Sequence, residues 1–127
     1  MDMKLELIAV PVSDVDRAKE FYTRIGFACD MDQVVSDDIR FIQFTPPGSA
    51  CSIAFGKGIS TMQPGSLDGL QAVVKDAEEA RKYMLDHGVE VGEVDVQDWG
   101  KFVYFKDPDG NGWALQELPD YAKTSEV

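Results

Sequence analysis

The chain has 127 residues and a formal net charge of −11, with 12 Lys or Arg against 23 Asp or Glu. This length fits one domain, and the content of 44% hydrophobic and 28% charged residues is typical of a soluble globular protein. The excess of acid leaves no basic surface for phosphates, so we expect neither a nucleic-acid partner nor an anionic membrane partner.

The start of the chain and its cysteines indicate the cellular compartment of the protein. Residues 1–6 carry acidic side chains where a signal peptide needs basic ones, and the apolar run that follows is too short to span a membrane. Cys29 and Cys51 both fall in strand-like runs and lack the dense spacing of a disulfide framework. We interpret them as reduced, half-buried thiols and expect a cytoplasmic protein.

The first half of the chain, about residues 4–56, is predicted to form one strand, one helix and three further strands. Apolar strand-like residues lead to Asp14, which can cap a helix of about three turns that ends at Gly26. The strand-like runs after this glycine are 27–31, 39–45 and 51–55. This half therefore reads as a βαβββ module.

The second half, about residues 67–118, repeats the first. The stretches "LELIAVPVSDVDRAKEFYTRIGF" and "LDGLQAVVKDAEEARKYMLDHGV" align without a gap, so that Asp76 and Gly88 take the places of Asp14 and Gly26. The strand-like runs that follow are 89–94, 102–106 and 113–117. A segment rich in Gly, Ser and Pro, about 57–66, links the halves.

The second half also contains the most tightly specified turn. Asp107-Pro108-Asp109-Gly110 fits a type I turn position by position, with Asp at i, Pro at i+1 and Gly at i+3. Each βαβββ module is too small for a core of its own, and the two would bury their apolar faces together. We therefore expect one α+β domain over residues 1–127, built from two tandem modules.

The tandem modules, with "VSDVDRAKEFYTRIGF" early and "DPDGNGWALQE" late, resemble the vicinal oxygen chelate superfamily. This superfamily includes glyoxalase I, bleomycin-resistance proteins and extradiol dioxygenases, and the resemblance spans about residues 4–118. It implies that the sheets of the two modules curl around a shared cavity and that the protein forms a homodimer. It also implies that, in the enzymes, a divalent metal is held in the cavity by four side chains, usually His and Glu.

The four places that the resemblance assigns to metal ligands hold unsuitable residues. Carried over by motif position, they are Leu7, Gln43, Gly69 and Ala114. Three of these side chains cannot coordinate a metal, and one neutral amide holds a divalent ion weakly. The single histidine, His87, precedes the stop glycine of the second helix, where a cation suits the helix dipole. We expect no metal, no other cofactor and no catalytic residue, since a Gly-rich phosphate loop, a CxxC motif and a Ser-His-Asp set are also missing.

Strand alternation predicts which side chains line the expected cavity, because residues two apart share a face of a strand. The predicted ligand-binding residues are Leu7, Phe41, Gln43, Ser52, Gln71, Trp99, Phe102, Tyr104, Ala114 and Gln116. Ser52 is placed by the symmetry of the repeat, which matches it with Ala114 at an offset of 62 residues, and Trp99 is placed by its loop. Their apolar and aromatic surface suits a neutral or planar organic molecule, which the amides would orient. Three converging buried amides are costly without a ligand or ordered water. The cavity is therefore expected to hold one or the other.

Some of these residues have a second interpretation. Leu7, Phe41 and Phe102 fit simple core filling equally well. Trp99, in the expected loop 95–100, either closes over a flat ligand or packs at a dimer contact.

Metal-independent binding or sequestration of a small organic molecule is the leading functional hypothesis. One alternative is an enzyme of the same superfamily, a lyase, isomerase or dioxygenase, with an unusual metal site or metal-free catalysis by Tyr104 or a glutamine. The other is a regulatory or partner-binding module with a vestigial cavity, which a pocket filled by its own side chains would favour.

Overall fold

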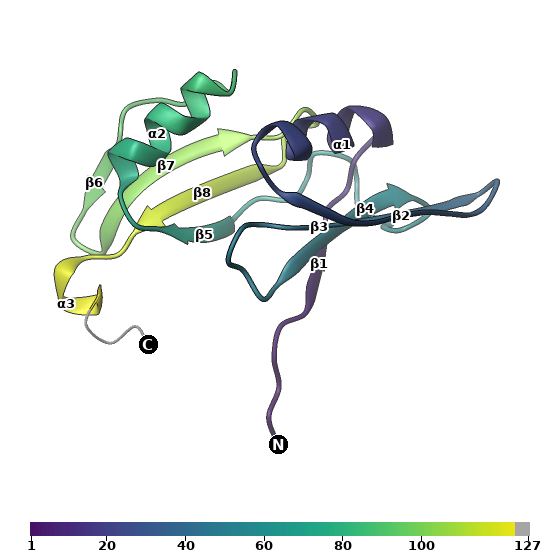
Figure 1. Cartoon of the computed structure of the whole chain (residues 1–127), viewed down its shortest axis with the longest axis horizontal. Coiled ribbons are helices and arrows are strands. Elements are labelled where there is room, and N and C mark those ends of the chain that lie inside the picture. The colour runs from purple at the N-terminus through teal and green to yellow at the C-terminus, as the bar shows by residue number, and fades with distance from the viewer. Residues whose placement is uncertain (124–127) are drawn as a thin grey trace. The chain divides into compact units, whose positions relative to one another are not determined.

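Each half of the computed structural model, which describes residues 1–123, contains a strand, a helix and three strands (Figure 1). The first half contains β1 (Leu7–Ala9), α1 (Val15–Arg24), β2 (Ala28–Ser36), β3 (Ile39–Thr45) and β4 (Ser52–Lys57). The second contains β5 (Leu70–Val74), α2 (Ala77–Asp86), β6 (Asp95–Gln97), β7 (Gly100–Lys106) and β8 (Gly112–Glu117), and α3 (Asp120–Lys123) follows. Every helix in this described part of the chain is too short or too polar for a membrane span.

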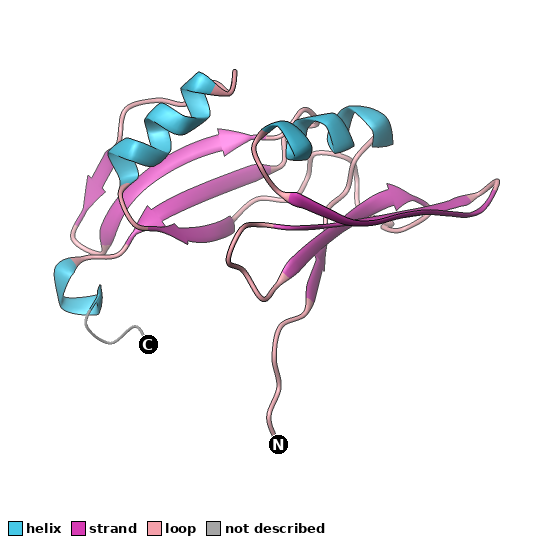
Figure 2. Cartoon of the chain, in the orientation of Figure 1, coloured by secondary structure: helices cyan, strands magenta, loops and turns pink. Residues whose placement is uncertain are grey.

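The two halves have the same sheet topology. One sheet has the strand order β1-β4-β3-β2 and the other β5-β8-β7-β6. The first strand of each sheet pairs in parallel with the last strand of its module, and the remaining pairs are antiparallel. Figure 2 shows one long helix lying over each sheet. The prediction of two tandem βαβββ modules is confirmed.

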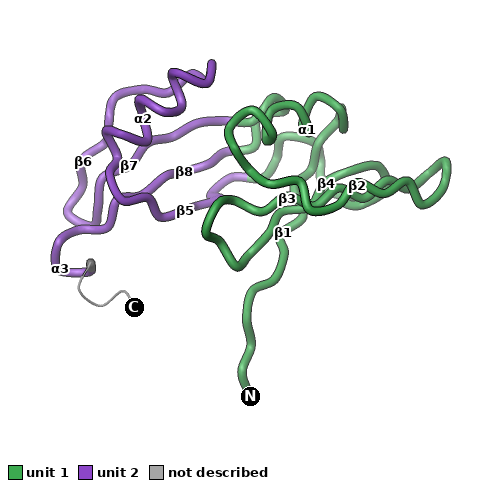
Figure 3. The backbone as a smooth tube through the Cα atoms, in the orientation of Figure 1, with its two compact units in different colours: residues 1–67, 107–111 green, residues 68–106, 112–127 purple. Residues whose placement is uncertain are grey.

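The chain divides into two compact units (Figure 3). Unit 1 contains Met1–Leu67 together with Asp107–Asn111, and unit 2 contains Asp68–Lys106 and Gly112–Val127. The turn between β7 and β8 therefore belongs to the unit built by the first half of the chain.

Matched residues lie at the start and at the end of the two long helices, as the repeat predicts. Asp14 accepts a hydrogen bond from the Arg17 amide, and Asp76 accepts one from the Glu79 amide, both at 3.0 Å. Gly26 and Gly88 follow the last turns with φ of 97° and 77°, a conformation that favours glycine. His87 is the C-cap of α2, and its Nδ1 lies 2.7 Å from the Tyr83 carbonyl oxygen.

Aromatic packing between helix and sheet forms the core of unit 1. Tyr22 of α1 is fully buried, and its ring centroid lies 6.2 Å from that of Phe44 and 5.6 Å from that of Phe55. Phe44 and Phe55 stack on each other at 5.6 Å. In unit 2, Phe105 and Trp113 stack at 5.8 Å, and both are buried. These rings mark the helix-facing side of each sheet.

The turn between β7 and β8 is held inside unit 1 by hydrogen bonds to Asp107. The Gly110 amide donates to the Asp107 carbonyl, as the predicted type I turn requires. The Asp107 carboxylate accepts from the buried Tyr22 hydroxyl at 2.8 Å and from the Asn111 side chain at 2.9 Å. Asn111 also donates to the Pro11 carbonyl and accepts from the Leu67 amide. The turn is therefore attached to the rest of unit 1 by side-chain hydrogen bonds, and its role is structural.

Two predicted strands differ from the observed strands by more than two residues at one end or both. The run 89–94 lies outside any strand, and β6 is Asp95–Gln97. A two-residue turn after Gln97 determines which residues of this segment pair with β7. The run 27–31 extends to Ser36 for the same reason, since a two-residue turn lets β2 continue along β3. The interpretation of Cys29 as half-buried is wrong: this thiol is exposed on β2, whereas Cys51 is half-buried.

Candidate functional site

The predicted binding residues occupy the sheet faces opposite the helices. We call the face of β1–β4 opposite α1 the first face, and the face of β5–β8 opposite α2 the second face. The first face carries Leu7, Ala9, Phe41, Gln43, Thr45, Ser52 and Ala54. The second face carries Gln71, Val73, Asp95, Phe102, Tyr104, Ala114 and Gln116. Strand alternation thus assigned each predicted strand residue to the face that the sheet register gives it.

An alanine lies at the centre of each face. On the first face, Ala54 pairs with Ala9 on one side and Gln43 on the other. On the second face, Ala114 pairs with Gln71 and Tyr104. Both alanines are buried, at 0% and 8% exposure. Each face therefore has a small-residue floor with polar groups beside it.

The partners of these two alanines correct the match between the modules that was predicted from the sequence. The offset of 62 makes Ser52 the counterpart of Ala114, but the ladders match Gln43–Ala54 with Tyr104–Ala114. The segment between α2 and β7 and the turn between β7 and β8 are each one residue shorter than their counterparts in the first half, so the counterpart of Ala114 is Ala54. Ser52 still lies on the first face, since it is two residues from Ala54.

Hydrogen bonds within the second face satisfy two of the predicted amides. Gln71 Nε2 donates to Gln116 Oε1 at 2.7 Å, and Gln116 Nε2 donates to the Trp99 carbonyl oxygen at 2.9 Å. Gln71 is also exposed, and no described residue has a buried side-chain nitrogen or oxygen that lacks a partner. The expectation that these amides require a ligand or water is therefore wrong for Gln71 and Gln116.

Tyr104 lies half-exposed beside Ala114, and its hydroxyl donates to Asp95 Oδ2 at 2.9 Å. This hydrogen bond, followed by partial desolvation and the Asp95 charge, raises the pKa of Tyr104. The phenol thus holds its proton more firmly and is a poor general base. Phe102, two residues before, stacks parallel to the Tyr104 ring at 6.0 Å and is 5% exposed.

The first face contains a second hydroxyl chain that ends at a carboxylate. The Thr45 hydroxyl donates to Asp30 and lies 2.7 Å from the Ser52 hydroxyl. Because the Thr45 proton is directed to Asp30, Ser52 must be the donor to Thr45. The half-buried Gln43 amide, in contrast, makes no side-chain hydrogen bond with residues 1–123. Gln43 is therefore the predicted amide whose donor and acceptor atoms all remain available to a ligand.

Sequence reasoning missed four residues of these faces. Ala54 and Thr45 share the face of residues already predicted, Ser52 and Gln43, so strand alternation alone was sufficient to find them. Asp30 lies at an irregularity in the pairing of β2, between Cys29 and Met31, and Asp95 lies in a strand whose bounds were predicted wrongly. Neither acid had a signal in the sequence.

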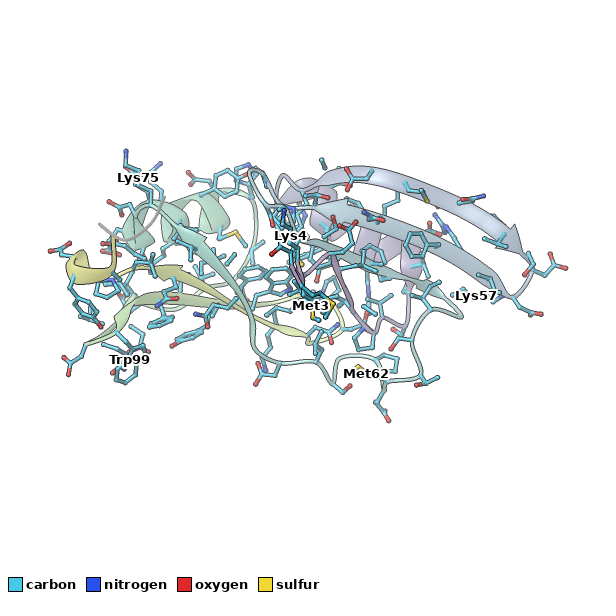
Figure 4. All side chains as sticks on the ribbon, turned by 90° about the horizontal axis from the view of Figure 1, so that it is seen from below. Met3, Lys4, Lys57, Met62, Lys75 and Trp99 are labelled. Atoms are coloured by element: carbon cyan, nitrogen blue, oxygen red, sulfur yellow. The ribbon has the colours of Figure 1, made fainter. Side chains whose placement is uncertain are left out.

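Trp99 lies in the turn that joins β6 to β7 rather than in a longer loop. Its side chain is 58% exposed, and in Figure 4 the ring projects outward at the edge of the molecule. The backbone of this turn is held by Gln116, which connects Trp99 to the second face.

The donor set does not fit the metal site of the superfamily enzymes. Leu7 and Gln43 lie on the first face and Ala114 on the second, and Gly69 immediately precedes β5 with φ of 89°. None of these four residues supplies a carboxylate, imidazole or thiolate. Within the described residues, no three His, Cys, Asp or Glu side chains are grouped to hold a metal ion.

Comparison with known proteins gives a family and close structural relatives. The family model for the Glyoxalase/Bleomycin resistance protein/Dioxygenase superfamily matches residues 4–115. The protein YetH of Bacillus subtilis strain 168 is 30% identical over 122 residues, which cover 92% of this chain and 100% of YetH.

Two solved structures from Streptomyces sp. CB03234 are similar in fold and sequence. TnmS3, an antibiotic binding protein, has a TM-score of 0.84 and 34% identity over 93% of this chain and 98% of its own. A glyoxalase/bleomycin resistance protein has a TM-score of 0.78 and 35% identity over 90% of this chain and 100% of its own.

Proposed function

Because the chain belongs to the glyoxalase/bleomycin resistance protein/dioxygenase superfamily, we propose that it binds a small, planar or aromatic organic molecule without a metal. The first face around Ala54 and the second face around Ala114 are each a candidate surface for the ligand, and binding sequesters it. The two free cysteines agree with a cytoplasmic location, where thiols stay reduced.

The observation that carries this proposal is the composition of the two faces. Tyr104 beside Ala114 offers a half-exposed aromatic surface for stacking on the second face, and Phe41 offers one on the first face. Gln43, whose amide is available, would orient the ligand. The similarity to TnmS3, described as an antibiotic binding protein, supports a ligand of this kind.

Catalysis by a superfamily enzyme has less support. The four metal-ligand places lack ligands, and the proton of Tyr104 is held by Asp95, which argues against metal-free catalysis by this phenol. Binding that survives dialysis against a chelator, with less than stoichiometric metal by elemental analysis, is the expected result. Loss of binding on chelation would instead favour a metal enzyme.

A thermal-shift screen against planar aromatic compounds, followed by calorimetry, tests the proposal directly. Saturating ligand at a hundredfold excess over Kd should stabilise the protein by about 2.7 kcal/mol. Gln43→Leu should weaken binding by about 1 kcal/mol without loss of stability, because this amide has no hydrogen bond within residues 1–123 to lose. Gln63→Leu, an exposed change in the linker, is the matched control. A screen without any binder, or equal binding by both variants, would overturn the proposal.

We further propose that the protein is a homodimer that associates through β2. This strand is the outer strand of its sheet, and all nine of its residues are exposed. Met31, Val34 and Val35 on it are exposed apolar side chains, and unpaired edge strands favour association. Light scattering after size exclusion should give a dimer, and Val34→Lys should give a monomer. A monomeric parent protein would refute this proposal.

A further inference from the structure

The hydrogen-bond direction of the polar groups on the two faces limits which ligands they can recognise. A hydroxyl has one proton and two lone pairs, so a hydroxyl that donates to the protein can only accept from a ligand. The acceptors that fix these protons are a carboxylate on each face and a backbone carbonyl on the second face. None of these acceptors can reverse its role.

On the second face, both side chains that flank Ala114 direct a proton away from the ligand. The Tyr104 hydroxyl donates to Asp95, which leaves the phenol oxygen as an acceptor. The Trp99 carbonyl can only accept, so Gln116 must present its nitrogen to it and its oxygen to Gln71. Gln71 therefore donates one amide hydrogen to Gln116, and it retains its carbonyl oxygen and a second hydrogen.

On the first face, an independent set of residues also donates its hydroxyl protons to acceptors within the protein. Ser52 donates to Thr45, and Thr45 donates to Asp30. Both hydroxyls thus have their protons committed in a chain that ends at a carboxylate. Among the partners that residues 1–123 provide, none engages the Gln43 amide of this face, so both its donor and its acceptor atoms are available.

We infer that the protein selects aromatic ligands that carry hydrogen-bond donors, such as phenolic hydroxyl or N–H groups, over ligands of the same shape that only accept. This inference rests on the proposed function, since it names the chemistry of the ligand at the same faces. The net charge of −11 acts in the same direction, because it disfavours anionic ligands such as carboxylates and phosphates.

Matched pairs of dihydroxy aromatics and their dimethyl ethers test the inference. The probes are the diols of naphthalene, anthracene and biphenyl, each titrated by calorimetry beside its ether. A diol that binds should do so about tenfold more tightly than its ether, as expected for one lost hydrogen bond. Tyr104→Phe should weaken the diol about tenfold and leave the ether unchanged, because only the acceptor oxygen is removed.

A second variant separates hydrogen-bond direction from the bulk of the added methyl groups. Asp95→Ala frees the Tyr104 proton, so the ether should gain affinity about threefold or more while the diol changes little. If the added methyl groups were simply too large for the site, the parent protein and the variant would both bind the ether weakly. Tyr83→Phe, which removes a hydroxyl from α2 on the opposite side of the sheet, should change neither affinity.

The outcomes distinguish this inference from the proposed function. Ethers that bind as tightly as diols, or an ether affinity that Asp95→Ala does not raise, would overturn the donor selectivity and leave aromatic binding intact. Failure of all six probes to bind would overturn the proposed function, and the inference with it.

Discussion

Gly100 shows at the scale of single residues how the second face is assembled. A Cβ atom at this position would lie 2.8 Å from the Glu117 carbonyl oxygen and 2.9 Å from Gln116 Nε2. Its φ of +146° is also one that other residues rarely adopt. Glycine therefore gives the Gln116 amide the space in which it reaches the Trp99 carbonyl.

Gly100→Ala should consequently destabilise the protein and disturb the second face. We expect a loss of about 2 kcal/mol in the free energy of unfolding, from backbone strain and the displaced Gln116 amide. Chemical denaturation measures this loss, and the fluorescence of Trp99 in a Trp113→Phe background reports the turn. Gly92→Ala is the control, because a Cβ there has nothing within 4 Å and φ is not positive. Equal stability of the two variants would contradict this account of Gly100.

The amides also show what sequence reasoning cannot supply at this scale. Alternation predicted correctly that Gln71 and Gln116 share a face, since that depends only on the period of a strand. Their mutual hydrogen bond depends on which residues of β5 and β8 are opposite each other. That register is set by the parallel ladder between strands far apart in the chain, and no local pattern encodes it.

At the scale of elements, an ionic network attaches α1 to the hairpin of β2 and β3. Asp32 of β2 accepts from Arg40 Nη2 of β3 at 2.9 Å and from Lys19 Nζ of α1 at 2.7 Å. Arg40 also donates to Asp16 of α1 at 2.9 Å. The hydrogen bonds from Arg40 and Lys19 hold the pKa of Asp32 well below its usual range, and those from Asp32 and Asp16 raise the pKa of Arg40.

This network predicts a specific dependence of stability on pH. A depressed pKa in the folded state means that ionised Asp32 contributes fully above its unfolded pKa of about 4. The contribution is lost as the pH falls through the lower folded pKa. Asp32→Asn should therefore cost about 1–2 kcal/mol at neutral pH, and this difference should shrink below about pH 4.

Thermal denaturation of the parent protein and the variant across this pH range provides the measurement. Asp86→Asn is the control, because Asp86 forms an exposed pair with Lys82 within α2, and such pairs contribute little. A stability difference for Asp32→Asn that stays constant down to pH 2 would show that the network is not responsible.

The elements themselves were predictable to different degrees. β3 matches its predicted bounds because most of its residues are β-branched or aromatic and a turn rich in Pro and Gly ends it. β6 does not, because an edge strand of three residues is defined by its partner β7 rather than by its own sequence. The repeat predicted that both halves have the same topology, but one-residue differences between α2 and β7 and between β7 and β8 shifted the match between Ala114 and Ala54.

At the scale of the whole molecule, the chain returns from unit 2 to complete unit 1. Residues 107–111 belong to unit 1, although β7 and β8 on either side of them belong to unit 2. Asp107 is 4% exposed, and its carboxylate accepts from the Tyr22 hydroxyl, the Asp109 and Asn111 amides, and the Asn111 side chain. The turn that the sequence makes most recognisable therefore supports the core of the other half.

Asp107→Ala should destabilise unit 1 even though position 107 lies in the second half of the sequence. The variant removes the carboxylate that accepts from the buried Tyr22 hydroxyl and orders the turn, which together should cost about 3 kcal/mol or more. Hydrogen exchange resolves the effect by region, and amides of β3 and β4 should lose protection to at least the same extent as those of β8. Asp98→Ala, in the exposed turn between β6 and β7, should leave both regions unchanged. If Asp107→Ala lowered hydrogen-exchange protection in β8 alone, the hydrogen bonds of Asp107 would stabilise only the hairpin of β7 and β8 and not the core of unit 1.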